Sequence, residues 1–128
     1  GVLRGLHFQK PPYAQTKLVR CLKGEILDIA LDLRKKSTTY GQFETNFLSD
    51  KNKYELFIPK GFAHGFIVLS KSATVSYKVD NYYAPNYESG VLWNDKDLNI
   101  DWKIKLENII VSDKDKNLLP LNKINSPF

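Results

Sequence analysis

The chain has 128 residues, 42% hydrophobic and 26% charged, with a net charge of +5, which is typical of a folded domain and excludes collagen-like or wholly disordered chains. It has no apolar run long enough to cross a membrane and no visible leader, so we expect no membrane partner and a cytoplasmic location. The single cysteine, Cys21, excludes an intramolecular disulfide. Because the chain has no methionine, we expect that a segment before Gly1 is missing.

Short segments with alternating apolar and polar residues predict an all-β fold. In residues 25–33, three leucines and Ile29 form an apolar face, while Asp28, Ala30 and Asp32 form a polar one. Short strands separated by turn residues at intervals of about 8–12 residues favour an antiparallel sandwich or jelly roll. The predicted strands are 17–22, 25–33, 43–48, 54–58, 65–69 and 73–79.

Residues 112–119 are the one stretch that predicts a helix, of one or two turns. Ser112 is expected to be its N-cap, with Asp115 at the third position. No linker, internal repeat or low-complexity tract is present, so residues 1–128 are expected to form a single domain.

The chain has two histidines, His7 and His64, and apolar residues flank both of them. We therefore expect each imidazole to lie in a largely apolar interior. A buried histidine can simply be satisfied by a backbone carbonyl, but two in an all-β chain, near the cations Arg4 and Lys17, favour a chemical role.

The phrase Pro-Lys-Gly-x-x-His at residues 59–64 is typical of the second half of a cupin barrel signature. Metal-binding cupins supply His-x-His and a glutamate in the first half, where this chain has only His7-x-Gln9. Two histidines cannot form a three-histidine site, and neither stretch has the spacing of a site with two histidines and a carboxylate. We expect no metal and no other cofactor.

Acid–base chemistry remains, with a neutral histidine as the base. Tyr77 lies on the apolar face of its predicted strand, so its phenol is expected to point into the barrel, either as a general acid or as an ordinary core tyrosine. Developing negative charge would need cations, and the candidates are Arg4, Lys17 and Arg20. The candidate carboxylates that could orient the base are Asp28, Asp32, Asp113 and Asp115.

The phrase Arg4-Gly5-Leu6-His7 and several later stretches resemble the dTDP-4-dehydrorhamnose 3,5-epimerase family over nearly the whole chain. The resemblance implies a metal-free cupin jelly roll, that is, a double-stranded β-helix, in a homodimer. It also implies exchange of the protons at C3 and C5 of dTDP-4-dehydro-6-deoxy-D-glucose, in dTDP-L-rhamnose biosynthesis. The stretches are residues 2–9, 11–15, 17–20, 24–28, 32–34, 58–66, 77–78, 81–85, 99–102 and 112–116.

The resemblance also implies roles for individual side chains. His7 matches the family's proton-abstracting base, and Asp115 matches the aspartate that pairs with it. Lys17 matches the lysine that stabilises the enolate. Tyr77 matches the acid on the opposite face of the sugar.

Five further matches concern substrate binding. By the resemblance, Arg4 and Lys114 would hold the diphosphate, and Tyr83 would stack on the thymine. His64 would line the site, and Glu88 falls where the family contacts the nucleotide.

The family also carries an N-terminal segment that precedes the matching stretches and, by the resemblance, adds strands, nucleotide contacts and support for dimerisation. Three alternatives remain beside the double epimerase. A related enzyme would invert only C3 or only C5 of a dTDP-sugar, and a non-catalytic cupin would bind the sugar nucleotide without turnover. A nucleic-acid-binding module would need a basic stripe with exposed aromatics, and because the lysines are scattered we expect no nucleic-acid partner.

Overall fold

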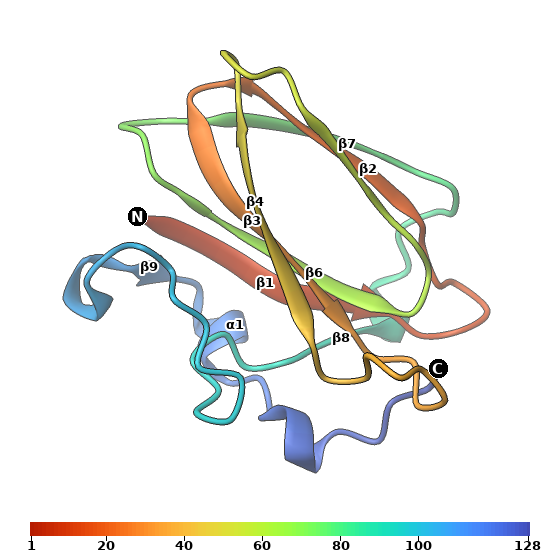
Figure 1. Ribbon diagram of the computed structural model, residues 1–128. Coiled ribbons are helices and arrows are strands. Elements are labelled where there is room, and N and C mark those ends of the chain that lie inside the picture. Colours follow the sequence, from red (N-terminus) through yellow and green to blue (C-terminus); the bar gives the residue numbers. More distant parts are fainter.

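The computed structural model describes all 128 residues and is built from two facing β-sheets (Figure 1). The larger sheet has the order β4 (Phe43–Ser49), β3 (Glu25–Asp32), β6 (Phe62–Val68), β1 (Val2–Gln9) and β8 (Glu88–Gly90), and β9 (Ile110–Val111) pairs with β1. The smaller sheet has the order β5 (Glu55–Ile58), β2 (Lys17–Lys23) and β7 (Thr74–Val79). All pairs are antiparallel except β1 with β9.

The strands predicted from alternation are all present, and the all-β prediction is confirmed. The boundary of β6 differs, because this strand begins at Phe62 rather than at residue 65. Strand β1 was not among the predicted strands. Its pairing with β6 shifts between Arg4 and His7, and Gly5 and Leu6 are both buried, so the side chains of β1 do not alternate regularly between inside and outside.

Strand β3 is buried on both faces, so the prediction of one apolar and one polar face describes its sequence but not its exposure. The leucines of β3 and Ile29 belong to one apolar cluster, on the outer face of the larger sheet. Ile26 and Ala30 belong to a second cluster, between the two sheets. Asp28 and Asp32 alternate with these two residues and are also buried, so each needs a partner inside the protein.

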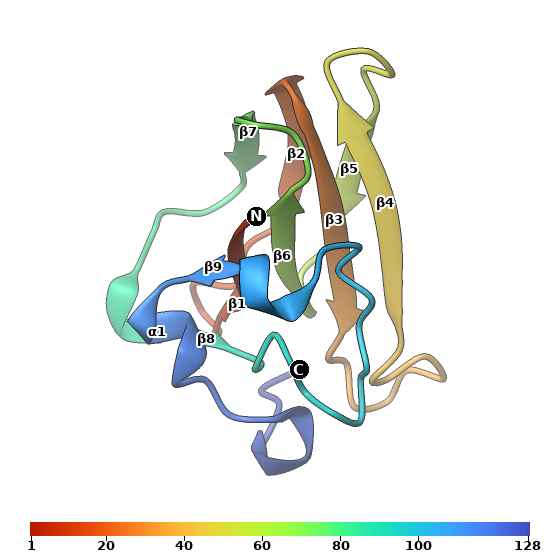
Figure 2. The ribbon, with the colours of Figure 1, turned by 90° about the vertical axis from the view of Figure 1, so that its left-hand side faces the viewer.

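The outer face of the larger sheet is covered by the C-terminal part of the chain. Figure 2 shows this part, coloured cyan to blue, crossing the face of the sheet. Val91, Trp102 and Val111 pack against β1 and β3 in the same apolar cluster. This packing carries the C-terminal helix to the side of β1.

That helix, α1 (Asp113–Lys116), confirms the predicted N-cap. The side chain of Ser112 accepts a hydrogen bond from the backbone N–H of Asp115. The helix is a single turn that ends at Lys116, so the longer alternative of residues 112–119 is wrong. The other helical segments are the 3-10 turns η1 (Pro85–Tyr87), η2 (Leu106–Asn108) and η3 (Leu121–Lys123), and no helix is long and apolar enough to span a membrane.

Asp32 lies at the end of β3, where its carboxylate accepts hydrogen bonds from the backbone and guanidinium of Arg34 and from the hydroxyl of Thr39. Burial opposes ionisation of this carboxyl, but the hydrogen bonds from Arg34 and Thr39 outweigh burial and hold its pKa below the ordinary range. Asp32 therefore stabilises the turn that follows β3 and takes no part in a site.

We expect Asp32→Asn to lower the free energy of unfolding by about 2 kcal/mol at neutral pH, because it removes the charge that Arg34 and Thr39 bind. Since the folded-state pKa is lowered, this stabilisation is present above the unfolded pKa of about 3.9 and is lost as the pH falls through the folded value. Urea unfolding of both proteins across the acidic range measures the difference. A difference that stays constant with pH would contradict this origin.

Candidate active site

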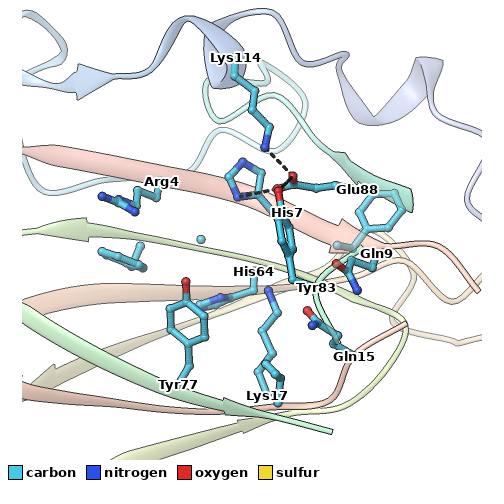
Figure 3. Close-up of a pocket in the computed structure, with 14 residues that line it drawn as sticks. Arg4, His7, Gln9, Gln15, Lys17, His64, Tyr77, Tyr83, Glu88 and Lys114 are labelled. Atoms are coloured by element: carbon cyan, nitrogen blue, oxygen red, sulfur yellow. Dashed lines mark hydrogen bonds and ion pairs between the residues drawn. The ribbon is translucent and has the colours of Figure 1, made fainter. Parts of the chain in front are cut away.

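A cavity of about 430 Å³ opens between the two sheets. Every side chain to which the resemblance gives a role lines this cavity except Asp115, which lies behind His7. Figure 3 shows Lys17 and Tyr77 pointing into it from the smaller sheet, opposite Arg4 and His7 on β1. The lining residues predicted from the sequence are Arg4, His7, Lys17, His64, Tyr77, Tyr83, Glu88 and Lys114.

The imidazole of His7 is held by a buried carboxylate. Its Nε2 lies 2.7 Å from Oδ1 of Asp115, and the backbone N–H of Gly5 donates to Oδ2 of the same carboxylate at 3.1 Å. Since both oxygens of Asp115 act as acceptors, Nε2 of His7 is the protonated ring nitrogen. The unprotonated Nδ1 is then available to accept a proton.

Of the four candidate aspartates, Asp115 is the one that contacts His7. Oδ2 of Asp28 lies 2.9 Å from Nε2 of His64, within the protein interior. Asp32 binds Arg34, and Asp113 pairs with Lys116 at the surface. His64 lies in the interior as expected, next to Phe66, whereas His7 is only partly buried, and each imidazole contacts a carboxylate.

Lys17 and Tyr77 form the wall opposite His7. Burial lowers the pKa of Lys17, while the negative charges of Asp28 and then Glu88 oppose this shift. Tyr77 points into the cavity (Figure 3) and is 53% exposed, far more than a core tyrosine. The cavity is open to solvent at this point.

Glu88 links the mouth of the cavity to His7. Its Oε2 accepts hydrogen bonds from the hydroxyl of Tyr83 at 2.8 Å and from Nζ of Lys114 at 2.6 Å, and its Oε1 lies 3.9 Å from Nδ1 of His7. Burial opposes ionisation of Glu88, but these two hydrogen bonds outweigh it and lower its pKa. The hydrogen bond to Glu88 in turn raises the pKa of Tyr83 and that of Lys114.

Two glutamines of the lining were not predicted as site residues. The amide of Gln9 donates to the carbonyls of Tyr13 and Tyr82, and its oxygen accepts from the N–H of Ala84. Gln15 donates to the carbonyl of Asn81. Both therefore hold the loop that carries Tyr83. The sequence offers a signal for Gln9 alone. It follows His7 by two residues on β1, a spacing that places both side chains on the cavity face.

Arg20, a candidate cation, does not reach the cavity. It alternates with the buried Val19 and Cys21 on β2, and its guanidinium pairs with Glu55 at 3.4 Å. The prediction for Arg20 is therefore wrong. In the whole chain, no group of three or more His, Cys, Asp or Glu side chains is arranged to hold a metal ion.

Two glycines let β1 approach β6 closely where β1 carries Arg4 and His7. A Cβ on Gly65 would lie 2.7 Å from the carbonyl oxygen of Arg4 and 2.8 Å from the side chain of Leu6. Gly5 has a φ of +126° and would meet the backbone of Gly65. A side chain at either position would displace the strand that carries His7.

The comparisons with known proteins agree with this architecture. The family model described as dTDP-4-dehydrorhamnose 3,5-epimerase matches residues 1–123. This chain belongs to the dTDP-4-dehydrorhamnose 3,5-epimerase family. A family member from Methanothermobacter thermautotrophicus is 52% identical over 124 residues, which are 96% of this chain and 66% of that protein. The chain thus spans just under two thirds of this relative's length.

Solved structures of the 3,5-epimerase family share the fold, which confirms the predicted cupin jelly roll. The enzyme from Elizabethkingia anophelis superposes with a TM-score of 0.94 at 51% identity, covering 95% of this chain and 67% of that one. The enzyme from Legionella pneumophila, solved with dTDP-4-keto-L-rhamnose, gives 0.93 at 46% identity, covering 98% and 65%. A 3'-monoepimerase from Streptomyces bikiniensis, solved with dTDP-quinovose, gives 0.87 at 32% identity, covering 95% and 61%.

We expect Gly65→Ala to lower the free energy of unfolding by about 1–3 kcal/mol, because the methyl group overpacks the contact between β1 and β6. The contact of His7 with Asp115 should loosen as well. Thermal unfolding measures the first effect, and histidine ring NMR measures the second. Unchanged stability together with unchanged His7 resonances would show that β1 does not depend on this close approach.

Proposed function

We propose that the protein epimerises dTDP-4-dehydro-6-deoxy-D-glucose at C3 and C5, giving dTDP-4-dehydro-L-rhamnose in dTDP-L-rhamnose biosynthesis. One observation carries the proposal: a histidine held by a buried aspartate faces a tyrosine across a cavity that also contains a lysine ammonium. Family membership and the Legionella enzyme's complex with a dTDP-sugar support the same substrate.

The chemistry follows from the C4 ketone of the substrate. A proton on C3 or C5 becomes acidic when the resulting enolate oxygen is stabilised, and the ammonium of Lys17 supplies that stabilisation. Nδ1 of His7 removes the proton, and Asp115 stabilises the imidazolium that forms. Tyr77 returns a proton from the opposite face of the ring, which inverts the centre. His7 then loses its proton to solvent and Tyr77 regains one, and repetition at the second carbon completes the reaction without a cofactor.

The nucleotide is bound at the mouth of the cavity. Arg4 and Lys114 bind the diphosphate, because their charges face the opening and phosphate is the anion that such side chains bind. Tyr83 stacks on the thymine, and His64 lines the sugar site. Lys114 and Tyr83 both contact Glu88 in the free protein, so binding exchanges part of these contacts for contacts with the substrate.

The protein acts as a homodimer in this proposal. Exposed apolar side chains favour association, since Leu22 is 52% exposed and Phe57 is 65% exposed on the smaller sheet. Sedimentation equilibrium distinguishes the two states, and a monomer at all concentrations would contradict the dimer.

A single-centre epimerase is the second candidate, favoured by the structural similarity to the 3'-monoepimerase. The base and the acid would be the same side chains in both enzymes, because the position of the sugar decides which carbon reacts. The count of exchanged positions therefore separates the two candidates.

The first experiment incubates the protein with dTDP-4-dehydro-6-deoxy-D-glucose in heavy water, without added metal, and follows C3 and C5 by proton NMR. We expect deuterium at both positions, unaffected by a chelator, and a rate at least about 100-fold lower in His7→Ala. Exchange at one carbon would favour the single-centre enzyme. Binding without exchange would favour a non-catalytic cupin, and wild-type exchange in His7→Ala would exclude His7 as the base.

Tyr77→Phe separates proton removal from proton return. Because the variant keeps the ring and loses only the hydroxyl, we expect epimerisation to fall by about 100-fold or more, while wash-out of the substrate proton falls less. Parallel NMR measurements of wash-out and of product formation give the two rates. Normal epimerisation at both centres in Tyr77→Phe would identify a different group as the acid.

A further inference from the structure

The cavity contains a second histidine–aspartate pair that the proposed reaction does not use as base or acid. Nε2 of His64 lies 2.9 Å from Oδ2 of Asp28. Asp28 is fully buried and His64 is 6% exposed. The pair is deeper than that of His7 and Asp115, in which the histidine side chain is 25% exposed.

The sheet register places the second pair in the floor of the cavity. Asp28 lies opposite Phe66 and Ala30 lies opposite His64 in the pairing of β3 with β6. Asp28 and His64 are therefore diagonal neighbours on the inner face of the larger sheet. Both His64 and Phe66 line the cavity, and Asp28 lies beneath them.

One oxygen of Asp28 is left without a partner. Oδ2 contacts His64, but Oδ1 is buried and has no hydrogen bond. A buried carboxylate with an unused acceptor is unfavourable unless a positive charge or a donor lies nearby. The position of Asp28 is therefore explained only in part by His64.

The nearby positive charge is the ammonium of Lys17, which enters the cavity from β2 in the opposite sheet. Burial lowers its pKa, and the first opposing influence is the charge of Asp28, ahead of that of Glu88. The other titratable or charged groups that line the cavity with Lys17 are Arg4 and His7 on β1, His64 on β6, Tyr77 on β7, Tyr83 in the loop before β8, and Lys114 on α1.

We propose that Asp28 is a positioning residue that orients His64 through Oδ2 and, through the charge of its unpaired Oδ1, keeps the buried ammonium of Lys17 protonated. Its two oxygens thereby serve different side chains. An ionised Asp28 accepts from Nε2–H of His64, so Nδ1 of this ring is the unprotonated nitrogen.

The consequence for catalysis rests on the proposed function. Lys17 can stabilise an enolate only as an ammonium, and its desolvated position favours the neutral amine. Asp28, whose Oδ1 has no hydrogen-bond partner, offsets that tendency from its place opposite Phe66. Asp28 itself touches no substrate in this scheme, so its effect reaches the reaction through Lys17.

The test measures the protonation of Lys17 without substrate. Trace acetylation with acetic anhydride across a range of pH, followed by peptide mass spectrometry, gives the labelling midpoint of each lysine. In Asp28→Asn we expect the midpoint of Lys17 to fall by about one pH unit or more, because the isosteric change removes the opposing negative charge. The exposed Lys10 is the internal control. An unchanged midpoint for Lys17 overturns the proposal.

Asp32→Asn is the matched control variant. Asp32 is a buried aspartate on the same face of β3, but its partner is Arg34. We expect this variant to lose stability and to keep the wild-type midpoint of Lys17. A shift as large as that in Asp28→Asn would attribute the effect to general loosening of β3 and would overturn the proposal.

A second measurement changes Lys17 and observes His64. It covers the case in which Asp28→Asn does not fold. The chain has only two histidines, so ring-¹⁵N NMR of histidine-labelled protein resolves both imidazoles. In Lys17→Met we expect the ring nitrogens of His64 to shift more than those of His7. Unmoved His64 resonances would show that Lys17 and the pair of Asp28 with His64 are not coupled.

Kinetic measurements test whether Asp28 affects turnover through Lys17. In Asp28→Asn we expect kcat to fall and its alkaline limb to move to lower pH, with a smaller change in KM. In the Lys17→Arg background, where the cation cannot lose its proton, the same substitution should leave the limb in place. A uniform fall at every pH would indicate a packing role and overturn the proposal. Failure of the proposed function would instead abolish turnover of the wild type and leave the labelling result intact.

Discussion

The structure depends on covering both faces of the larger sheet. Strand β3 is buried on each side, so its outer leucines need an apolar layer against them. The C-terminal part of the chain provides that layer through Val91, Trp102 and Val111. The same packing carries α1 to the side of β1, where Asp115 contacts His7. Burial of apolar surface therefore assembles the pair that the proposed chemistry uses.

The inner face of the same sheet has the opposite character. Between the sheets, apolar side chains fill one part of the barrel, and the other part holds carboxylates, imidazoles and the ammonium of Lys17. Such charges are stable away from water only when each has a partner. Asp115 with His7, Asp28 with His64, and Glu88 with Lys114 meet this requirement. Two of these pairs also meet each other, because Oε1 of Glu88 lies 3.9 Å from Nδ1 of His7.

The predictions from sequence succeeded where a local pattern is enough. Alternation and turn residues located β2 to β7, with the start of β6 placed too late, and the Ser112 cap located α1. The sequence pattern missed β1, because the shift in register between Arg4 and His7 breaks the alternation that identifies a strand. Arg20 was named among the candidate cations for its charge alone, and residue type does not say which face of β2 the side chain occupies.

The sequence by itself determined the fold class, the family and the residue types available for acid–base chemistry, because strand periodicity and motif spacing are local properties of the chain. The resemblance pointed to Asp115 as the partner of His7, but only the tertiary structure showed that contact and paired Asp28 with His64. Asp28 lies on β3, diagonal to His64, whereas Asp115 reaches His7 across more than a hundred residues. Contacts at such separations follow from how the sheets and the C-terminal layer pack, and no local pattern encodes that packing.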